Sequence, residues 1–213
     1  MKKLSIAFAV ASVLVGVSYA ASNTVETVLG YTKITIPTNQ YVLVSLDFNN
    51  ESNTISGLFG GLPTGTRVYT WNTTVQNYNT FLKTRSGWGA PGTNKIQRGM
   101  GAFVMLPTGV QTNMILSGIV PTAGTTTVYK ANGYSMISYP YPVLVAFTNT
   151  ALAKTAAIGD RLSVWQNNAW KVYLKSRGGW LGAEGLQIKP GQAFFFQSAT
   201  GGSANEIRPY AVN

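Results

Sequence analysis

The 213-residue chain carries a formal net charge of +10, has no Cys and no His, and only 10% of its residues are charged. Without Cys there is no disulfide scaffold, thiolate metal site or Cys nucleophile, and without His there is no His-based triad or proton shuttle. The composition, 45% hydrophobic, also excludes a charge-rich disordered tail. The length allows one large β domain or two small ones.

The first 20 residues have the form of a secretory signal peptide. Lys2 and Lys3 precede an apolar run from Leu4 to Val17, and Ser18-Tyr19-Ala20 is a small-x-small cleavage site. The run is short for a membrane helix and lacks a basic stop-transfer flank. We therefore expect bacterial-type export to the extracellular space or cell surface, with no membrane span after leader cleavage.

The positive charge does not form a patch in the sequence. The 16 Lys and Arg residues are spread along the chain without a run of three. A net positive charge is compatible with binding to nucleic acid, an anionic glycan or an acidic cell surface, but export argues against nucleic acid. A generally basic exported protein is the simpler interpretation.

Residues 21–30 follow the leader as a polar N-terminal arm or a weak first strand, and residues 31–36 alternate up to Pro37. Its β-favouring side chains predict a candidate assembly arm that pairs with an exposed sheet edge, either in the same molecule or in a neighbour. The alternative is a frayed terminus. The predicted arm residues are Thr24, Val25, Thr27 and Val28.

The rest of the chain consists of short β-rich runs separated by turn formers, and the runs occur twice. Residues 41–46, 65–71, 96–103 and 113–119 correspond to 134–139, 159–165, 188–195 and 205–212, with offsets of 92 to 94. The hairpin loops differ in length, residues 73–77 against 167–168. We expect a connector at 122–126 and short helical turns within 150–157.

This order predicts an all-β fold with two homologous small antiparallel halves, each a β-sandwich or barrel-like unit, from an internal duplication. The first β repeat is expected at residues 31–121 and the second at 122–213. Trp71 and Trp165 follow the same segment in each half, so we expect them to be equivalent core residues.

The most similar pair of segments has the form aromatic-Leu-Lys-hydroxyl-Arg-small-Gly-Trp, and we call it the twin motif. Strand periodicity places its aromatic, Lys and Arg side chains on one face, where they could contact a sugar ring or an anionic group. The alternative is a solvated face with each Trp closing the core. The candidate ligand or partner contacts are Phe81, Lys83, Arg85, Trp88, Tyr173, Lys175, Arg177 and Trp180.

No catalytic, cofactor or metal site is expected. The acidic residues are scattered, and neither a glycosidase pair nor a calcium site is indicated by their positions. We therefore predict that the protein is not an enzyme. The six acids are Glu26, Asp47, Glu51, Asp160, Glu184 and Glu206.

The second half resembles tandem repeat domains of secreted bacterial proteins of unknown function. The resemblance rests on residues 133–142, Gly159-Asp160-Arg161, Trp165, Gly179-Trp180 and 190–195, which follow a gDr…W…GW…PGqaFf pattern. The first half departs from it at Arg98-Gly99 and at Leu46-Asp47. The resemblance implies no activity.

Two functions remain after these exclusions. The first is a secreted structural subunit of an extracellular filament or lattice, because two similar halves favour head-to-tail self-association. The alternative is a glycan-binding module that uses exposed Trp, Tyr, Arg and Lys, with anionic and neutral glycans both open as ligands.

Overall fold

The structure is a computed structural model that describes residues 28–211. The predicted leader, Thr24, Val25 and Thr27 lie outside the described residues. The chain is 49% strand and 9% helix, and every pair of named strands is antiparallel, which confirms the all-β class. None of the helices within residues 28–211 is both long enough and apolar enough to cross a membrane.

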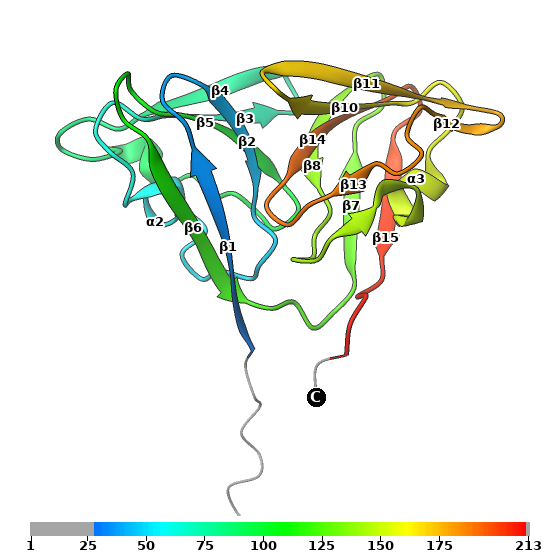
Figure 1. The fold of residues 1–213 in the computed structure, drawn as a ribbon, viewed down its shortest axis with the longest axis horizontal. Coiled ribbons are helices and arrows are strands. Elements are labelled where there is room, and N and C mark those ends of the chain that lie inside the picture. The colour runs from blue at the N-terminus through cyan, green and yellow to red at the C-terminus, as the bar shows by residue number, and fades with distance from the viewer. Residues whose placement is uncertain (1–27, 212–213) are drawn as a thin grey trace, which may run out of the picture.

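The first half contains a four-stranded sheet in the order β2-β5-β3-β4 and a separate two-stranded ribbon, β1-β6 (Figure 1). The helix α2 and the 3-10 turn η1 lie within its connections. The bounds are β1 (Leu29–Ile36), β2 (Tyr41–Ser45), α2 (Ile55–Phe59), β3 (Arg67–Asn72), β4 (Asn77–Leu82), η1 (Ala90–Thr93), β5 (Gly101–Met105) and β6 (Thr112–Ile119).

The second half contains a five-stranded sheet in the order β8-β14-β10-β11-β12 and two two-stranded ribbons, β7-β15 and β9-β13. The bounds are β7 (Thr125–Tyr129), β8 (Gly133–Ser138), β9 (Val145–Ala146), η2 (Phe147–Asn149), α3 (Ala151–Thr155), β10 (Arg161–Gln166), β11 (Ala169–Ser176), β12 (Gly179–Leu181), β13 (Gln187–Ile188), β14 (Ala193–Ser198) and β15 (Gly202–Glu206).

Two predictions about the connections need correction. Residues 122–126 are not only a connector, because β7 begins at Thr125 and pairs with β15. The arm is also shorter than predicted, because Leu29 and Gly30 belong to β1 and pair with Ile119 and Gly118. The alternating residues 31–36 predicted most of β1, whereas the Thr-rich start of β7 gave too weak a pattern to place that strand.

The two short helices begin in the same way. Thr54 caps α2 and Thr150 caps α3, and each hydroxyl accepts a hydrogen bond of 3.1 Å from the amide three residues on. Such a cap satisfies one of the free N–H groups at a helix start. Helical turns were predicted for α3, whereas the Gly-rich sequence around α2 concealed a helix.

The hairpin loops differ in length, as predicted. Asn167 and Asn168 both have positive φ, 50° and 57°, which suits the two-residue turn between β10 and β11. The β3-β4 loop is longer and has positive φ only at Gln76. In spite of the different loops, Trp71 lies opposite Tyr78 in one hairpin and Trp165 lies opposite Trp170 in the other.

Each half has a core of its own. One cluster of buried side chains contains residues 36–116 only, and another contains residues 129–204 only. A third cluster joins residues of both halves, and we call it the junction cluster. Its buried members are Leu43, Phe103, Met136, Ala193 and Phe195.

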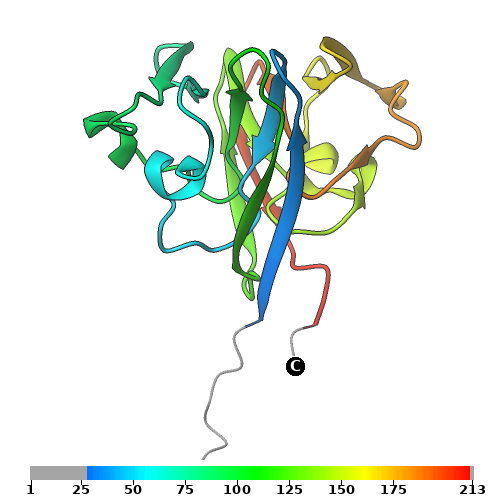
Figure 2. The same ribbon diagram turned by 60° about the vertical axis from the view of Figure 1, so that its left-hand side comes forward.

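Main-chain contacts across the junction are reciprocal. The Ser45 amide donates to the Gly191 carbonyl at 2.9 Å, and the Ser138 amide donates to the Gly99 carbonyl at 2.8 Å. Figure 2 shows the cyan and teal segments of the first half on one side of β1 and β6, and the yellow and orange segments of the second half on the other. The two sheets therefore meet through equivalent strands.

Candidate binding cleft

Alternation along the first sheet directs aromatic side chains toward the junction. Tyr69 and Trp71 lie on β3 with one residue between them, and Trp71 faces Tyr78 on β4 in register. Phe103 on β5 faces Tyr69 from the other side. Side chains at alternate positions of a strand, and at facing positions of its neighbours, share one face of a sheet.

The second sheet presents a similar set. Trp165 on β10 faces Trp170 on β11, and Ser163 lies between Val172 on β11 and Phe195 on β14. These side chains share the face that meets the first sheet. The second set has fewer tyrosines and more aliphatic surface than the first.

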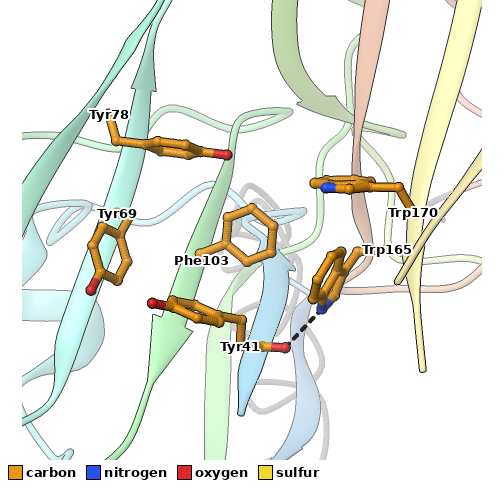
Figure 3. A pocket seen from close by; sticks show the side chains of 6 residues that line it. All are labelled: Tyr41, Tyr69, Tyr78, Phe103, Trp165 and Trp170. Atoms are coloured by element: carbon orange, nitrogen blue, oxygen red, sulfur yellow. Dashed lines mark hydrogen bonds between the residues drawn. The ribbon is translucent and has the colours of Figure 1, made fainter. Parts of the chain in front are cut away.

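Two adjoining pockets lie between these faces, and together we call them the aromatic cleft. Both are lined by Tyr78 and Trp170. Pocket A has a volume of about 250 Å³ and is lined by Tyr41, Tyr69, Tyr78, Phe103, Trp165 and Trp170 (Figure 3). Pocket B has a volume of about 380 Å³ and is lined by Trp71, Tyr78, Tyr134, Ser163, Trp170, Val172 and Phe195.

The rings of pocket A form a box around Phe103. The ring centroids of Tyr41, Tyr78, Trp165 and Trp170 lie 6.0, 6.2, 5.7 and 5.8 Å from that of Phe103, at interplanar angles of 63° to 88°. Figure 3 shows the Phe103 ring face-on with the other rings arranged around it. Edge-to-face pairs of this kind are favourable beyond the area they bury.

Two reciprocal hydrogen bonds hold the cleft together. The Trp71 indole donates to the Tyr134 carbonyl, and the Trp165 indole donates to the Tyr41 carbonyl, each at 2.9 Å. Each bond joins one half to the other. The prediction that Trp71 and Trp165 are core residues of their own halves is therefore wrong, because both are partly exposed and pack at the junction.

The cleft side chains carry no charge at neutral pH. Burial raises the pKa of Tyr78. Burial also raises the pKa of Tyr69, and the neighbouring Tyr41 hydroxyl adds to the rise, although Arg67 opposes it. The phenols of Tyr69 and Tyr78 are therefore neutral hydrogen-bond donors at physiological pH. About two-fifths of the side chain is exposed at each of Tyr41, Tyr78, Tyr134 and Trp170.

The aromatic members of the twin motif are not in the cleft. Phe81, Trp88, Tyr173 and Trp180 are at most 7% exposed and belong to the two cores. Trp88, Tyr173 and Trp180 therefore present no ring to a ligand at the surface, which corrects their prediction as contacts. Phe81 lines another pocket of about 240 Å³ outside the cleft. The phase of the strand explains this: Phe81 points inward, and its neighbour Leu82 points outward and is 48% exposed.

The basic members of the motif have two different environments. The Lys83 ammonium donates to the carbonyls of Gly60 and Leu62 just after α2, and the Lys175 ammonium donates to the Ala153 carbonyl within α3. Both lysines thus satisfy main-chain carbonyls beside the short helices. Arg85 and Arg177 are exposed and lie outside the cleft.

Three of the acids have structural partners. Glu206 accepts hydrogen bonds from the Ala151 and Leu152 amides at the start of α3, both at 3.0 Å. Asp160 accepts from the Ala157 amide at 2.9 Å, and Asp47 accepts from the Gly191 amide across the junction. Among residues 28–211, no three Asp or Glu residues gather closely enough to hold a metal ion.

The sequence contained a usable signal for the cleft. Tyr69, Trp71 and Tyr78 alternate along one hairpin, and Trp165 and Trp170 occupy similar places in the other. Exposed aromatic residues are expected to indicate glycan or partner contacts, but the sequence alone does not separate these aromatic residues from those of the core. Phe103 and Phe195 could not be found this way, because they lie within continuous apolar runs.

The function of this chain is inferred from the cleft, because comparison with known proteins finds no relative. No family model, curated protein or solved structure matches the chain.

Proposed function

We propose that the protein is an exported, non-catalytic glycan-binding protein that holds a neutral saccharide chain in the aromatic cleft. The observation that carries the proposal is the group of exposed, uncharged Trp and Tyr side chains around two adjoining pockets. A concave site lined mainly by aromatic side chains with a few polar groups is the usual form of a small-ligand binding site. Export rests on the predicted leader.

The chemistry of the cleft matches a sugar. A pyranose ring has apolar C–H faces, which stack on aromatic rings, and polar hydroxyls at its edge. The cleft offers ring faces together with the hydroxyls of Tyr69, Tyr78 and Ser163. Pockets A and B adjoin at Tyr78 and Trp170, so they suit successive rings of one chain. None of the cleft side chains is a Lys or Arg, so none could form a salt bridge with an anionic sugar.

Binding to neutral polysaccharides tests the proposal. Purified mature protein is run in native gels that contain β-glucan, xylan, mannan or soluble chitin fragments, and the dissociation constant is measured for any that retard it. We expect Tyr78→Ala and Trp170→Ala each to weaken binding at least fivefold, because a ring stacked on an aromatic side chain contributes about 1–3 kcal/mol, the range found for nucleic-acid bases. Tyr31→Ala, at a 71% exposed tyrosine on β1, is the control.

The proposal fails if no neutral polysaccharide retards the protein. It also fails if Tyr31→Ala weakens binding as much as Tyr78→Ala does, because Tyr31 lies outside both pockets. Far-ultraviolet circular dichroism of each variant separates loss of the ligand contact from loss of the fold.

A structural subunit of an extracellular assembly remains the second candidate. Four exposed apolar side chains on the ribbons favour self-association, namely Leu29, Tyr31, Ile115 and Val128. If residues 21–27 form the assembly arm, their deletion behind an intact leader should abolish filaments or lattices in negative-stain images. Normal assembly by the deleted protein would exclude the arm as the link. Monodisperse native protein would exclude the assembly itself.

We also propose that the halves at 31–121 and 122–213 arose by internal duplication. Support comes from the recurrence of similar segments at offsets of 92 to 94, from the shared strand orders β2-β5-β3-β4 and β8-β14-β10-β11, and from the reciprocal contacts of the junction. The structural equivalence of the two halves is tested by exchanging Gly101 and Ala193, which face each other across the junction.

A further inference from the structure

Pocket A differs from pocket B in one respect: every residue that lines it is aromatic. Phe103 forms the floor, and Tyr41, Tyr78, Trp165 and Trp170 stand around it (Figure 3). Tyr69 closes one side, with its centroid 5.7 Å from that of Tyr41. Pocket B instead includes Ser163 and Val172.

A box of ring faces has a specific electrostatic property. Each face carries the negative side of an aromatic quadrupole, and several faces that point at one volume attract a cation placed there. An attractive ring lies within about 6 Å of the cation. The four wall rings lie 5.7 to 6.2 Å from the Phe103 ring, between centroids. All of them border one pocket of about 250 Å³, so a group held above Phe103 contacts several rings at once.

We propose that pocket A binds a quaternary or fully methylated ammonium group. Such a cation is weakly hydrated and needs no hydrogen-bond acceptor, so a box without carboxylates can hold it. The group would belong either to a choline-like substituent on a glycan or to a free small molecule. This inference goes beyond saccharide binding, because the box can be occupied whether or not pocket B holds a sugar.

The positive charge of the protein does not prevent this binding. Arg67 lies two residues before Tyr69 on β3, close enough to affect the Tyr69 phenol, but its side chain is exposed to solvent. Charges at the surface are screened over about 8 Å at physiological ionic strength. We therefore expect Arg67→Gln to tighten ammonium binding less than threefold and to reduce its dependence on salt.

Titration with a cation and its neutral isostere tests the proposal. Choline and 3,3-dimethyl-1-butanol have the same shape but differ in charge, and both are titrated into the mature protein while tryptophan fluorescence is followed. We expect choline and tetramethylammonium to bind at least tenfold more tightly than the alcohol. Equal binding of the alcohol and choline, or no saturation by choline at millimolar concentration, would overturn the proposal.

Variants distinguish this site from the saccharide site. Trp170→Leu and Tyr78→Leu keep apolar volume but remove a ring face, so each should weaken choline binding at least fivefold. Val172→Ala alters pocket B alone and should leave choline binding unchanged while it weakens saccharide binding. An equal loss of choline binding in Val172→Ala and Trp170→Leu would contradict the assignment to pocket A.

A last comparison identifies the source of the group. A choline-bearing polysaccharide that binds at least tenfold more tightly than free choline, and loses that advantage in Val172→Ala, indicates a substituted glycan. Equal affinities indicate a free small molecule. Failure of plain polysaccharides to bind, with choline binding retained, would remove saccharide recognition and leave the ammonium site intact.

Discussion

The indole of Trp165 donates its N–H to the carbonyl oxygen of Tyr41 over 2.9 Å, although 124 residues separate the two. Trp71 makes the equivalent contact with Tyr134 in the opposite direction. These two bonds fix the tips of the β3-β4 and β10-β11 hairpins against the other half. The same residues contribute rings to the aromatic cleft, so stability of the junction and shape of the cleft are linked.

Replacement of either indole by a ring without a donor should loosen the junction. Trp165→Phe removes one hydrogen bond and leaves the Tyr41 carbonyl without its partner, which should lower the free energy of unfolding by about 1–2 kcal/mol. Trp71→Phe should have a smaller effect, because the Gln76 side-chain amide also donates to the Tyr134 carbonyl, at 3.1 Å. Urea denaturation measures both. If neither variant shifts the midpoint, the indole N–H groups do not stabilise the junction.

The two tryptophans of the twin motif should respond differently to the same substitution. The Trp180 N–H donates to the Ala153 carbonyl at 3.0 Å, whereas the buried Trp88 N–H has no hydrogen-bond partner among the described residues. A buried N–H without a partner costs about 1–3 kcal/mol. Trp88→Phe should therefore destabilise the protein by about 1 kcal/mol less than Trp180→Phe does. Equal losses would mean that water satisfies the Trp88 N–H.

Much of the fold was predictable because it depends on local periodicity. The β-rich runs at 41–46 and 65–71, the hairpin loops at 73–77 and 167–168 and the helical turns near 151 all follow from neighbouring residues. The ribbon strand β7 was missed because Thr125–Tyr129 has no marked alternation of apolar and polar residues. Its pairing with β15 is a long-range contact that local pattern does not encode.

The cleft was less predictable, because it depends on how two sheets face each other. Tyr78 and Phe81 lie on opposite faces of the same strand. Alternation along residues 78–82 does not show which of the two faces points outward. The twin motif is repeated in both halves, but Phe81 and Tyr173 are repeated as core residues. Only the packing of one sheet against the other shows that the opposite face, with Tyr78 and Trp170, lines the cleft.

Asp47 makes the stability of the junction depend on pH. Burial raises its pKa from 3.8 to about 6, although hydrogen bonds from Ser45 and Gly191 oppose the rise. In the unfolded chain the carboxyl ionises first, so this residue should lower the free energy of unfolding as the pH rises from about 4 to 6. The total loss is at most roughly 3 kcal/mol, since one pKa unit corresponds to about 1.4 kcal/mol.

An amide at this position removes the titration. Asp47→Asn cannot ionise, so the difference in unfolding free energy between the variant and the parent should grow in favour of the variant as the pH rises from 4 to 7. Thermal unfolding across this range measures the difference. Glu51→Gln, at an exposed acid, is the control and should keep the parental profile. Parallel profiles for Asp47→Asn and the parent would contradict the assignment of this pKa.

The contact between Gly101 and Ala193, which joins the two halves, should accept only one methyl group. A Cβ at Gly101 would lie 2.5 Å from the Cβ of Ala193 and 2.9 Å from the Cγ of Met136. Gly101 and Ala193 occupy equivalent places in β5 and β14, at an offset of 92. Gly101→Ala should therefore destabilise the protein by about 1–3 kcal/mol through overpacking.

The exchange Gly101→Ala with Ala193→Gly keeps one methyl group at the contact. Met136 has a flexible side chain that can move by a few tenths of an ångström. We expect the double variant to recover most of the stability lost in Gly101→Ala, with a coupling energy of about 1–2 kcal/mol in a double-mutant cycle. Additive losses in the two single variants would show that the halves do not meet at these residues, and would remove one support for their equivalence.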